Sequence, residues 1–195
     1  LEVLSDLVCN MKLLKKDFEL EKKVILQEIA MSDDTPEEII YDYLFEIAYA
    51  KHPLSRQILG KSETIQKMTQ KRVIDFYKKY YQGSNLIVSA SGPVDHDALV
   101  IECQKLFRTR KPYKIVNARR APIWKAGRQI YEKDLEQTHI LLALPAPSFQ
   151  DKFRFEAFIV NSLLGGGMTS RLYQAVREKQ GLAYSVFSTL NTQTD

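Results

Sequence analysis

Two glutamates, Glu21 and Glu28, stand seven residues apart in a segment with the period of an α-helix. An α-helix advances about 100° per residue, so seven residues return to within about 20° of two full turns. We therefore expect both carboxylates on one helix face, together with the apolar Phe18, Ile25 and Ile29. Carboxylates in an apolar stripe are costly unless cations, a metal or hydrogen-bond donors partner them. Two hypotheses follow: the carboxylates reach solvent or arginine partners, or one binds a metal and the other supports it.

The other residue types that could bind a metal or act as nucleophiles form no complete motif. His52, His96 and His139 do not fall into an HExxH or HxxEH arrangement, and the chain has no GxSxG or Walker sequence. The chain therefore cannot complete a tetrahedral zinc site with histidines at motif spacing. Cys9 and Cys103 are far apart in sequence, which favours free thiols in a reducing compartment over a CxxC site.

Composition places the chain among ordinary globular proteins. It has 195 residues, 45% of them hydrophobic, and a formal net charge of +4. No stretch approaches the roughly 20 apolar residues that a membrane-spanning helix needs, so no membrane span is predicted. The basic residues of 108–122 are accompanied only by the aromatic Tyr113, so we expect a solvated linker there rather than a nucleic-acid-binding patch.

The elements that must position these residues alternate between helical and strand patterns. Residues 14–31 hold a helical period, and Thr35 to Glu38 have the pattern of a capping box with proline at the first helical position. Thr69 is a further expected N-cap. Further helices are expected over 62–68, 97–107, 151–164 and 169–180, and strands over 85–90, 128–133, 138–144 and 182–189.

This order predicts an α+β protein with two α/β units. We expect residues 1–107 to form the C-terminal part of a first domain, 108–122 a linker, and 123–195 the N-terminal part of a second domain. Gly181 is the expected C′ residue of the helix before it, where the chain can reverse.

Four segments resemble the pitrilysin/insulinase family of zinc metallopeptidases, which includes bacterial members and mitochondrial processing peptidase. They are EKKVILQE at 21–28, HPLSRQILG at 52–60, LLGGGMTSRLY at 163–173 and REKQGLAYS at 177–185. The stretch 163–185 is the most specific, because a long ordered string matches. The resemblance implies tandem α/β units of the LuxS/mitochondrial processing peptidase-like type, both incomplete here.

The resemblance also implies roles for individual residues. Glu28 corresponds to the distal zinc ligand and Glu21 to the carboxylate that supports it. Arg177 and Tyr184 correspond to a pair that contacts the substrate carbonyl and its developing oxyanion. The run Gly165, Gly166 and Gly167 corresponds to a flexible loop beside the substrate.

One departure from the family is large. Its HxxEH segment, which supplies two histidine ligands and the general base, belongs further upstream than the 27 residues that precede Glu28. We therefore expect a fragment of a zinc metalloendopeptidase that binds no zinc and is inactive by itself, whereas the intact enzyme binds Zn²⁺. The alternative is a non-catalytic homologue that binds peptides or forms the structural core of a complex.

The resemblance gives expectations about partners and compartment as well. The substrate is expected to be a peptide or presequence, and the protein to act as a homodimer or with a paired subunit. Nucleic acid is not an expected partner. The expected location is intracellular, in the bacterial cytoplasm or the mitochondrial matrix.

Overall fold

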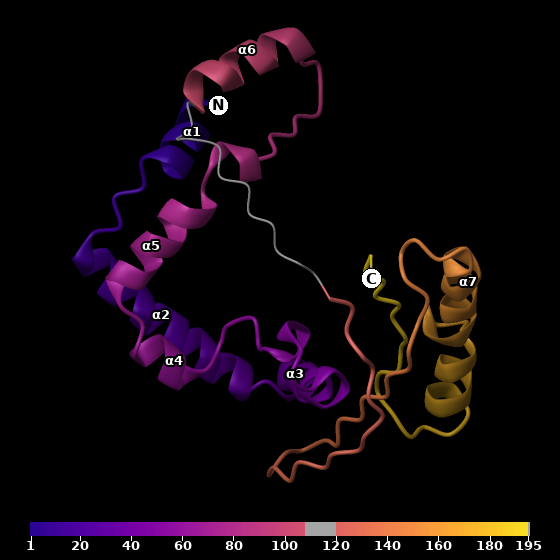
Figure 1. The fold of residues 1–195 in the computed structure, drawn as a ribbon. Coiled ribbons are helices and arrows are strands. Elements are labelled where there is room, and N and C mark those ends of the chain that lie inside the picture. Colours follow the sequence, from indigo (N-terminus) through magenta and orange to yellow (C-terminus); the bar gives the residue numbers. More distant parts are fainter. Residues whose placement is uncertain (108–119, 195) are drawn as a thin grey trace. The chain divides into compact units, whose positions relative to one another are not determined.

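The computed structural model describes residues 1–107 and 120–194 (Figure 1). Most of the expected linker at 108–122 therefore lies outside the described residues. The chain divides into two units. Unit 1 contains Leu1–Ile39 and Arg56–Arg119, and unit 2 contains Ile40–Ser55 and Arg120–Asp195. Each unit is described by itself below.

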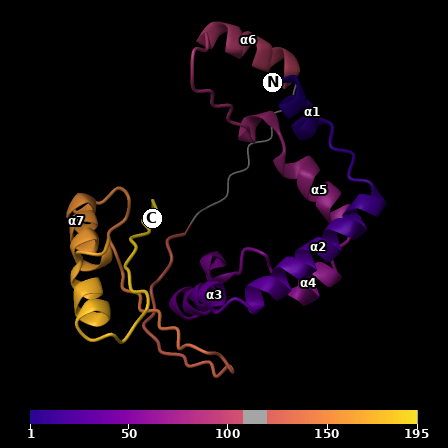
Figure 2. The ribbon, with the colours of Figure 1, turned by 180° about the vertical axis from the view of Figure 1, so that it is seen from behind.

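Unit 1 is built from helices. Its long helix α2 carries both candidate glutamates, and the short helix α4 packs against it, as both views show (Figures 1 and 2). The elements are α1 (Glu2–Cys9), α2 (Lys15–Asp33), α4 (Ser62–Gln66), α5 (Gln70–Tyr80), the 3₁₀ turn η2 (Gly83–Asn85) and α6 (His96–Leu106), and α3 (Pro36–Tyr49) begins in this unit and continues into unit 2.

Side-chain caps explain where two of these helices begin. Thr69 Oγ1 accepts the backbone N–H of Arg72 at the start of α5, which confirms the expected N-cap. Asp95 likewise accepts the N–H of Ala98 at the start of α6, at 2.8 Å. The capping box expected at Thr35 is wrong, because Thr35 Oγ1 donates to Met31 O at 2.8 Å and its backbone carbonyl, rather than its side chain, receives the first amides of α3.

Unit 2 joins the second half of α3 to the segment after residue 120. Lys125 N donates to Ala48 O at 2.9 Å, and Trp124 meets the ring of Tyr49 edge-on at 5.9 Å between centroids. Tyr43 and Tyr131 stack at 3.7 Å. The remaining elements are the 3₁₀ turn η1 (Pro53–Ser55), α7 (Arg154–Gly165) and the π-helical turn η3 (Tyr173–Glu178).

The structure differs from expectation in the four predicted strands. No described residue belongs to a strand, and the segments 85–90, 128–133, 138–144 and 182–189 contain no α-helix. Residues 138–144 still alternate, because Ile140, Leu142 and Leu144 are exposed while the residues between them are half-buried. A strand requires a ladder of backbone hydrogen bonds with a neighbour in addition to this alternation, and that ladder is what these segments lack.

Few apolar side chains are buried in the described part of the chain. The buried ones are Ile29 of α2 together with Ile39 and Ala48 of α3. Large apolar residues on α1 and α7, such as Leu4 and Ile159, are exposed. Within residues 1–107 and 120–194, no helix is long and apolar enough to cross a membrane.

Candidate functional site

The two candidate carboxylates lie on α2 in unit 1, seven residues apart, and both are exposed. Ile29, next to Glu28, is buried at 6% exposure. Glu21 and Glu28 therefore do not bear the desolvation cost that an apolar stripe would impose, which favours the solvent-facing alternative in this structure. Neither carboxylate has a hydrogen-bond or ion-pair partner among the described residues.

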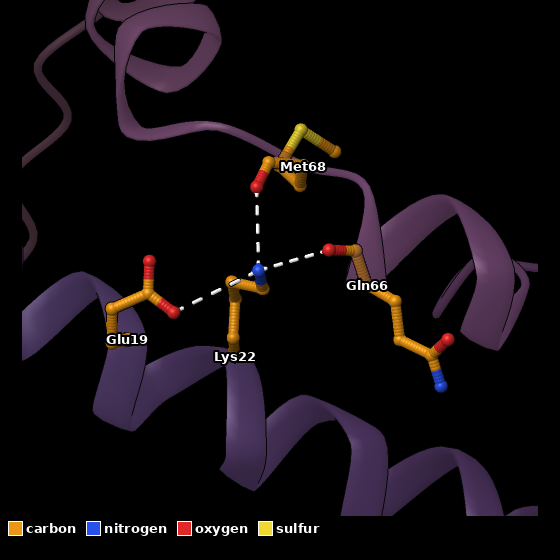
Figure 3. Close-up of polar contacts among 4 residues, drawn as sticks. All are labelled: Glu19, Lys22, Gln66 and Met68. Carbon is orange, nitrogen blue, oxygen red and sulfur yellow. Dashed lines mark hydrogen bonds and ion pairs between the residues drawn. The ribbon is translucent and has the colours of Figure 1, made fainter.

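Lys22, between these glutamates in sequence, fixes how α2 meets α4 (Figure 3). Its ammonium donates to Gln66 O at 3.0 Å and to Met68 O at 3.4 Å, and lies 3.8 Å from the Glu19 carboxylate. The side chain is only 18% exposed. The last carbonyls of a helix lack intrahelical donors and carry the negative end of the helix dipole, so a lysine is a favourable partner there. Lys22 thus ties the glutamate-bearing helix to the C-terminus of α4.

The described residues do not make a zinc site by themselves. No three His, Cys, Asp or Glu side chains among them are grouped so that they could hold a metal ion. Glu28 offers one exposed carboxylate, whereas a structural or catalytic zinc needs at least three protein ligands. His52 is engaged in unit 2, where Nε2 lies 2.9 Å from Arg120 O and Nδ1 accepts the N–H of Leu54 at 3.3 Å.

In unit 2 the structure brings Arg177 and Tyr184 together. The guanidinium carbon of Arg177 lies 5.3 Å from the centroid of the Tyr184 ring, within the range of a cation–π contact. Gly181 reverses the chain between them with a φ of +62°, which glycine adopts without strain. The amide of Gly181 donates to Arg177 O and that of Leu182 to Val176 O, both at 3.0 Å, so the turn is closed by two hydrogen bonds.

The helix expected over residues 169–180 contains a π-helical turn. Lys179 N donates to Gln174 O at 3.1 Å, which is the five-residue spacing of a π-helix. Such turns are rare and occur frequently at functional sites. Arg177 lies within this turn and is half-buried.

Tyr173 is a neighbour of Arg177 that the sequence analysis missed. Its ring centroid lies 4.8 Å from the Arg177 guanidinium, and Arg177 Nη1 donates a hydrogen bond to its Oη. The signal was the spacing of the two residues, because side chains four apart meet on a helix. No carboxylate pairs with Arg177 in the part of the chain that the structure describes. Its guanidinium therefore makes cation–π contacts with aromatic rings and no ion pair with a described carboxylate.

The three candidate loop glycines have different surroundings. Gly165 ends α7 and is buried, and a Cβ on it would lie 2.4 Å from Ser188 N. Ser188 N donates to Gly165 O at 3.1 Å, so this glycine permits a close backbone approach. Gly166 and Gly167 are exposed, and a Cβ on Gly167 would meet nothing within 4 Å. Ser170, just beyond, is buried, and its hydroxyl has no hydrogen-bond partner among the described residues.

A groove of about 320 Å³ in unit 1 lies apart from these candidates. It is lined by Cys9 at the end of α1, by the residues that follow it, including Lys12, and by α5, including Tyr77. Neither Glu21 nor Glu28 lines this groove.

Comparisons with known proteins agree on one family. Residues 67–195 match the family described as "Peptidase M16 inactive domain", and residues 1–62 match "Insulinase (Peptidase family M16)". An uncharacterized zinc protease of Rickettsia felis is 36% identical over 196 residues, which cover 100% of this chain and 47% of that protein. An uncharacterized zinc protease of Mycobacterium bovis is 35% identical over 203 residues, covering 100% of this chain and 45% of that protein. The chain thus spans about half the length of the curated relatives it matches.

Solved structures give the same answer for the fold. A protease from Helicobacter pylori superimposes with a TM-score of 0.74 at 25% identity, over 93% of this chain and 46% of that chain. A peptidase M16 inactive domain from Pseudomonas fluorescens also reaches a TM-score of 0.74, at 17% identity, over 97% of this chain and 46% of that chain. The fold is therefore that of the M16 proteins, in agreement with the predicted fold class. The chain belongs to the insulinase family of metallopeptidases, peptidase family M16.

Proposed function

We propose that this chain is the central part of a zinc-dependent metalloendopeptidase that cleaves peptides or presequences. The observation that carries the proposal is the pair Arg177 and Tyr184, which meet across the Gly181 turn. The guanidinium has no carboxylate partner among the described residues, and the tyrosine is 82% exposed. Both groups are thus available to donate hydrogen bonds to a substrate.

The chemistry assigned to this pair is stabilisation of negative charge on a carbonyl oxygen. A guanidinium carries five N–H donors, and a phenol carries one O–H donor. As an amide carbonyl becomes tetrahedral its oxygen gains negative charge, and fixed donors stabilise that charge more than they stabilise the ground state. Arg177 and Tyr184 would hold this oxygen, and the segment with Gly166 and Gly167 would lie beside the extended peptide.

The proposed role of the unit 1 carboxylates is metal binding in the whole protein. Glu28 would supply one zinc ligand and Glu21 would support it, since a carboxylate behind a metal site orients its ligands. Bound zinc supplies a Lewis acid and an activated water. The relatives from Rickettsia felis and Mycobacterium bovis are named zinc proteases, which supports this assignment.

The second candidate is a non-catalytic homologue that binds peptides or forms a structural core. It is favoured by the match of residues 67–195 to a domain described as inactive. In either role we propose that the protein works as a homodimer or with a paired subunit. The cellular compartment, bacterial cytoplasm or mitochondrial matrix, stays a prediction.

The test uses the whole protein that carries this chain. Arg177→Ala and Tyr184→Phe should each lower kcat/KM for a fluorogenic peptide by about 10- to 1,000-fold, the range for loss of a transition-state donor. Zinc content and melting temperature should stay at the wild-type values. Normal turnover by both variants would refute the carbonyl-binding role, and so would losses explained by unfolding. Peptide binding without turnover by the wild-type protein would favour the non-catalytic homologue.

A further inference from the structure

Two aromatic rings contact the Arg177 guanidinium in unit 2. Tyr173, four residues earlier, lies 4.8 Å from the guanidinium carbon, and Tyr184, seven residues later, lies 5.3 Å from it, both measured to the ring centroids. Arg177 Nη1 also donates to Tyr173 Oη. The two tyrosines differ in exposure, because Tyr184 is 82% exposed whereas Tyr173 is half-buried. Tyr173 therefore contacts the arginine from the less exposed side of the site, and Tyr184 contacts it from the solvent-exposed side.

This arrangement lowers the entropy cost of binding, which is larger for an arginine whose side chain is unrestrained. An arginine side chain carries about 2 kcal/mol of rotamer entropy, which is lost when the group is fixed on a substrate. A planar guanidinium against an aromatic face is already restricted, and the hydrogen bond to Tyr173 Oη restricts it further. Only one donor atom is used by that bond, so the remaining N–H groups stay available. A group that is oriented before binding binds more tightly and reacts faster than a mobile one.

We propose that Tyr173 is a positioning residue, which orients the Arg177 guanidinium for contact with the substrate carbonyl without touching the substrate itself. The inference rests on the proposed function of Arg177 and Tyr184 and adds a residue to it. Tyr173 and Arg177 both lie within the π-helical turn, four residues apart, a spacing that places their side chains on one face.

The experiment is a double-mutant cycle in the whole protein that carries this chain, read as kcat and KM on a fluorogenic peptide. Tyr173→Leu removes both the ring and the hydroxyl, and Tyr173→Phe removes the hydroxyl alone. We expect Tyr173→Leu to lower kcat/KM about 10- to 100-fold, mostly through kcat, and Tyr173→Phe to restore most of that loss, because the ring remains. Glu178→Gln is the matched control, since Glu178 is exposed in the same turn and has no partner among the described residues.

The decisive arm repeats Tyr173→Leu in the Arg177→Ala background. If Tyr173 acts through Arg177, the second substitution has no further effect on kcat/KM there, whereas a residue that only stabilises the fold lowers it in both backgrounds. Should Tyr173→Leu fail to fold, Tyr173→Met takes its place in the cycle, because it also lacks both the aromatic ring and the hydroxyl. If the wild-type protein binds peptide without cleaving it, the cycle is read in the dissociation constant of a fluorescent peptide.

The outcomes separate this inference from the function on which it rests. Normal turnover of the Arg177→Ala variant overturns the proposed function of Arg177 and the inference with it. An impaired Arg177→Ala variant beside a normal Tyr173→Leu variant overturns only the inference. Equal losses from Tyr173→Leu with and without Arg177 also overturn it, because the effect is then independent of the arginine.

Discussion

Replacing Gly165 by alanine tests whether the glycine run is held by packing at one end. Gly165 is the last residue of α7, and an added Cβ would lie 2.4 Å from Ser188 N, 2.6 Å from Ser188 Oγ and 2.9 Å from Phe187 C. Two of these three atoms are backbone atoms, so a change of side-chain rotamer cannot relieve the overlap. The segment that contains Ser188 must move away from α7.

The expected loss of stability follows from what this movement disturbs. Overfilling a packed site typically costs about 1–3 kcal/mol. The movement also strains the hydrogen bonds from Ser188 N to Gly165 O and from Ser188 Oγ to Asn161 O, both 3.1 Å long and each worth about 1 kcal/mol. Alanine is favoured over glycine in a helix by up to about 1 kcal/mol, which acts in the opposite direction. We expect Gly165→Ala to lower the free energy of unfolding by about 2 kcal/mol.

Urea unfolding of the wild type, Gly165→Ala and Gly167→Ala in parallel provides the measurement. Gly167 is the matched control, because it belongs to the same run, is exposed and has open space around its Cβ position. The control should stay within about 0.5 kcal/mol of wild type. Equal free energies of unfolding for the two variants would show that the close approach at Gly165 does not matter, and would refute the reasoning.

Three further predictions concern other residues. Lys22→Met keeps the apolar stem but removes the ammonium from the carbonyls at the end of α4, so the free energy of unfolding measured in urea should fall by about 1 kcal/mol. Lys23→Met is the control and should cause no loss, because Lys23 has no partner among the described residues. Glu28→Gln should leave the free energy of unfolding within about 0.5 kcal/mol of wild type but abolish stoichiometric zinc in elemental analysis of the whole protein. Glu21→Gln should retain the metal, and stoichiometric zinc in Glu28→Gln would contradict the ligand role. Partial desolvation raises the pKa of the Tyr131 phenol, so ionisation is harder in the folded state than in the unfolded state. The contribution of this group to the free energy of unfolding should be constant at neutral pH and fall as the pH rises above about 10, and urea titrations of Tyr131→Phe across that range should lack this fall.

Several features encoded by residues close in sequence were predictable. The helical period of residues 14–31 corresponds to α2, and Thr69 caps α5 as expected. Arg177 and Tyr184 meet across Gly181, which was predicted as the C′ residue of the helix before it and which adopts a positive φ. Each of these depends on residues close in sequence, so local propensity is sufficient to predict them.

Features that depend on distant partners were not predictable. The Lys22 contact joins residues 44 and 46 positions apart, and no local pattern marks it. The alternation of residues 138–144 is present, but a ladder requires a neighbouring strand that the pattern itself does not provide. One local prediction also failed. The Thr35 hydroxyl can either accept an amide of the helix after it or donate to the helix before it, and here it donates to Met31 O, four residues earlier.

Because residues 173–178 form a π-helical turn, the number of residues in this segment, as well as their types, determines the direction in which the Arg177 side chain points. A turn with five-residue hydrogen bonds accommodates one residue more than the surrounding α-helical spacing. Deletion of one residue within 173–178 would allow ordinary helical bonding and would rotate the chain after the deletion by about 100° relative to the chain before it. A gap at 174–176 would leave Tyr173 and Arg177 three residues apart, a spacing at which side chains still meet on an α-helix, whereas a gap at Glu178 would change how Tyr184 is placed relative to Arg177. Relatives that align with a gap at Glu178 should therefore lack the contact between the arginine and the second tyrosine, even where both residues are retained.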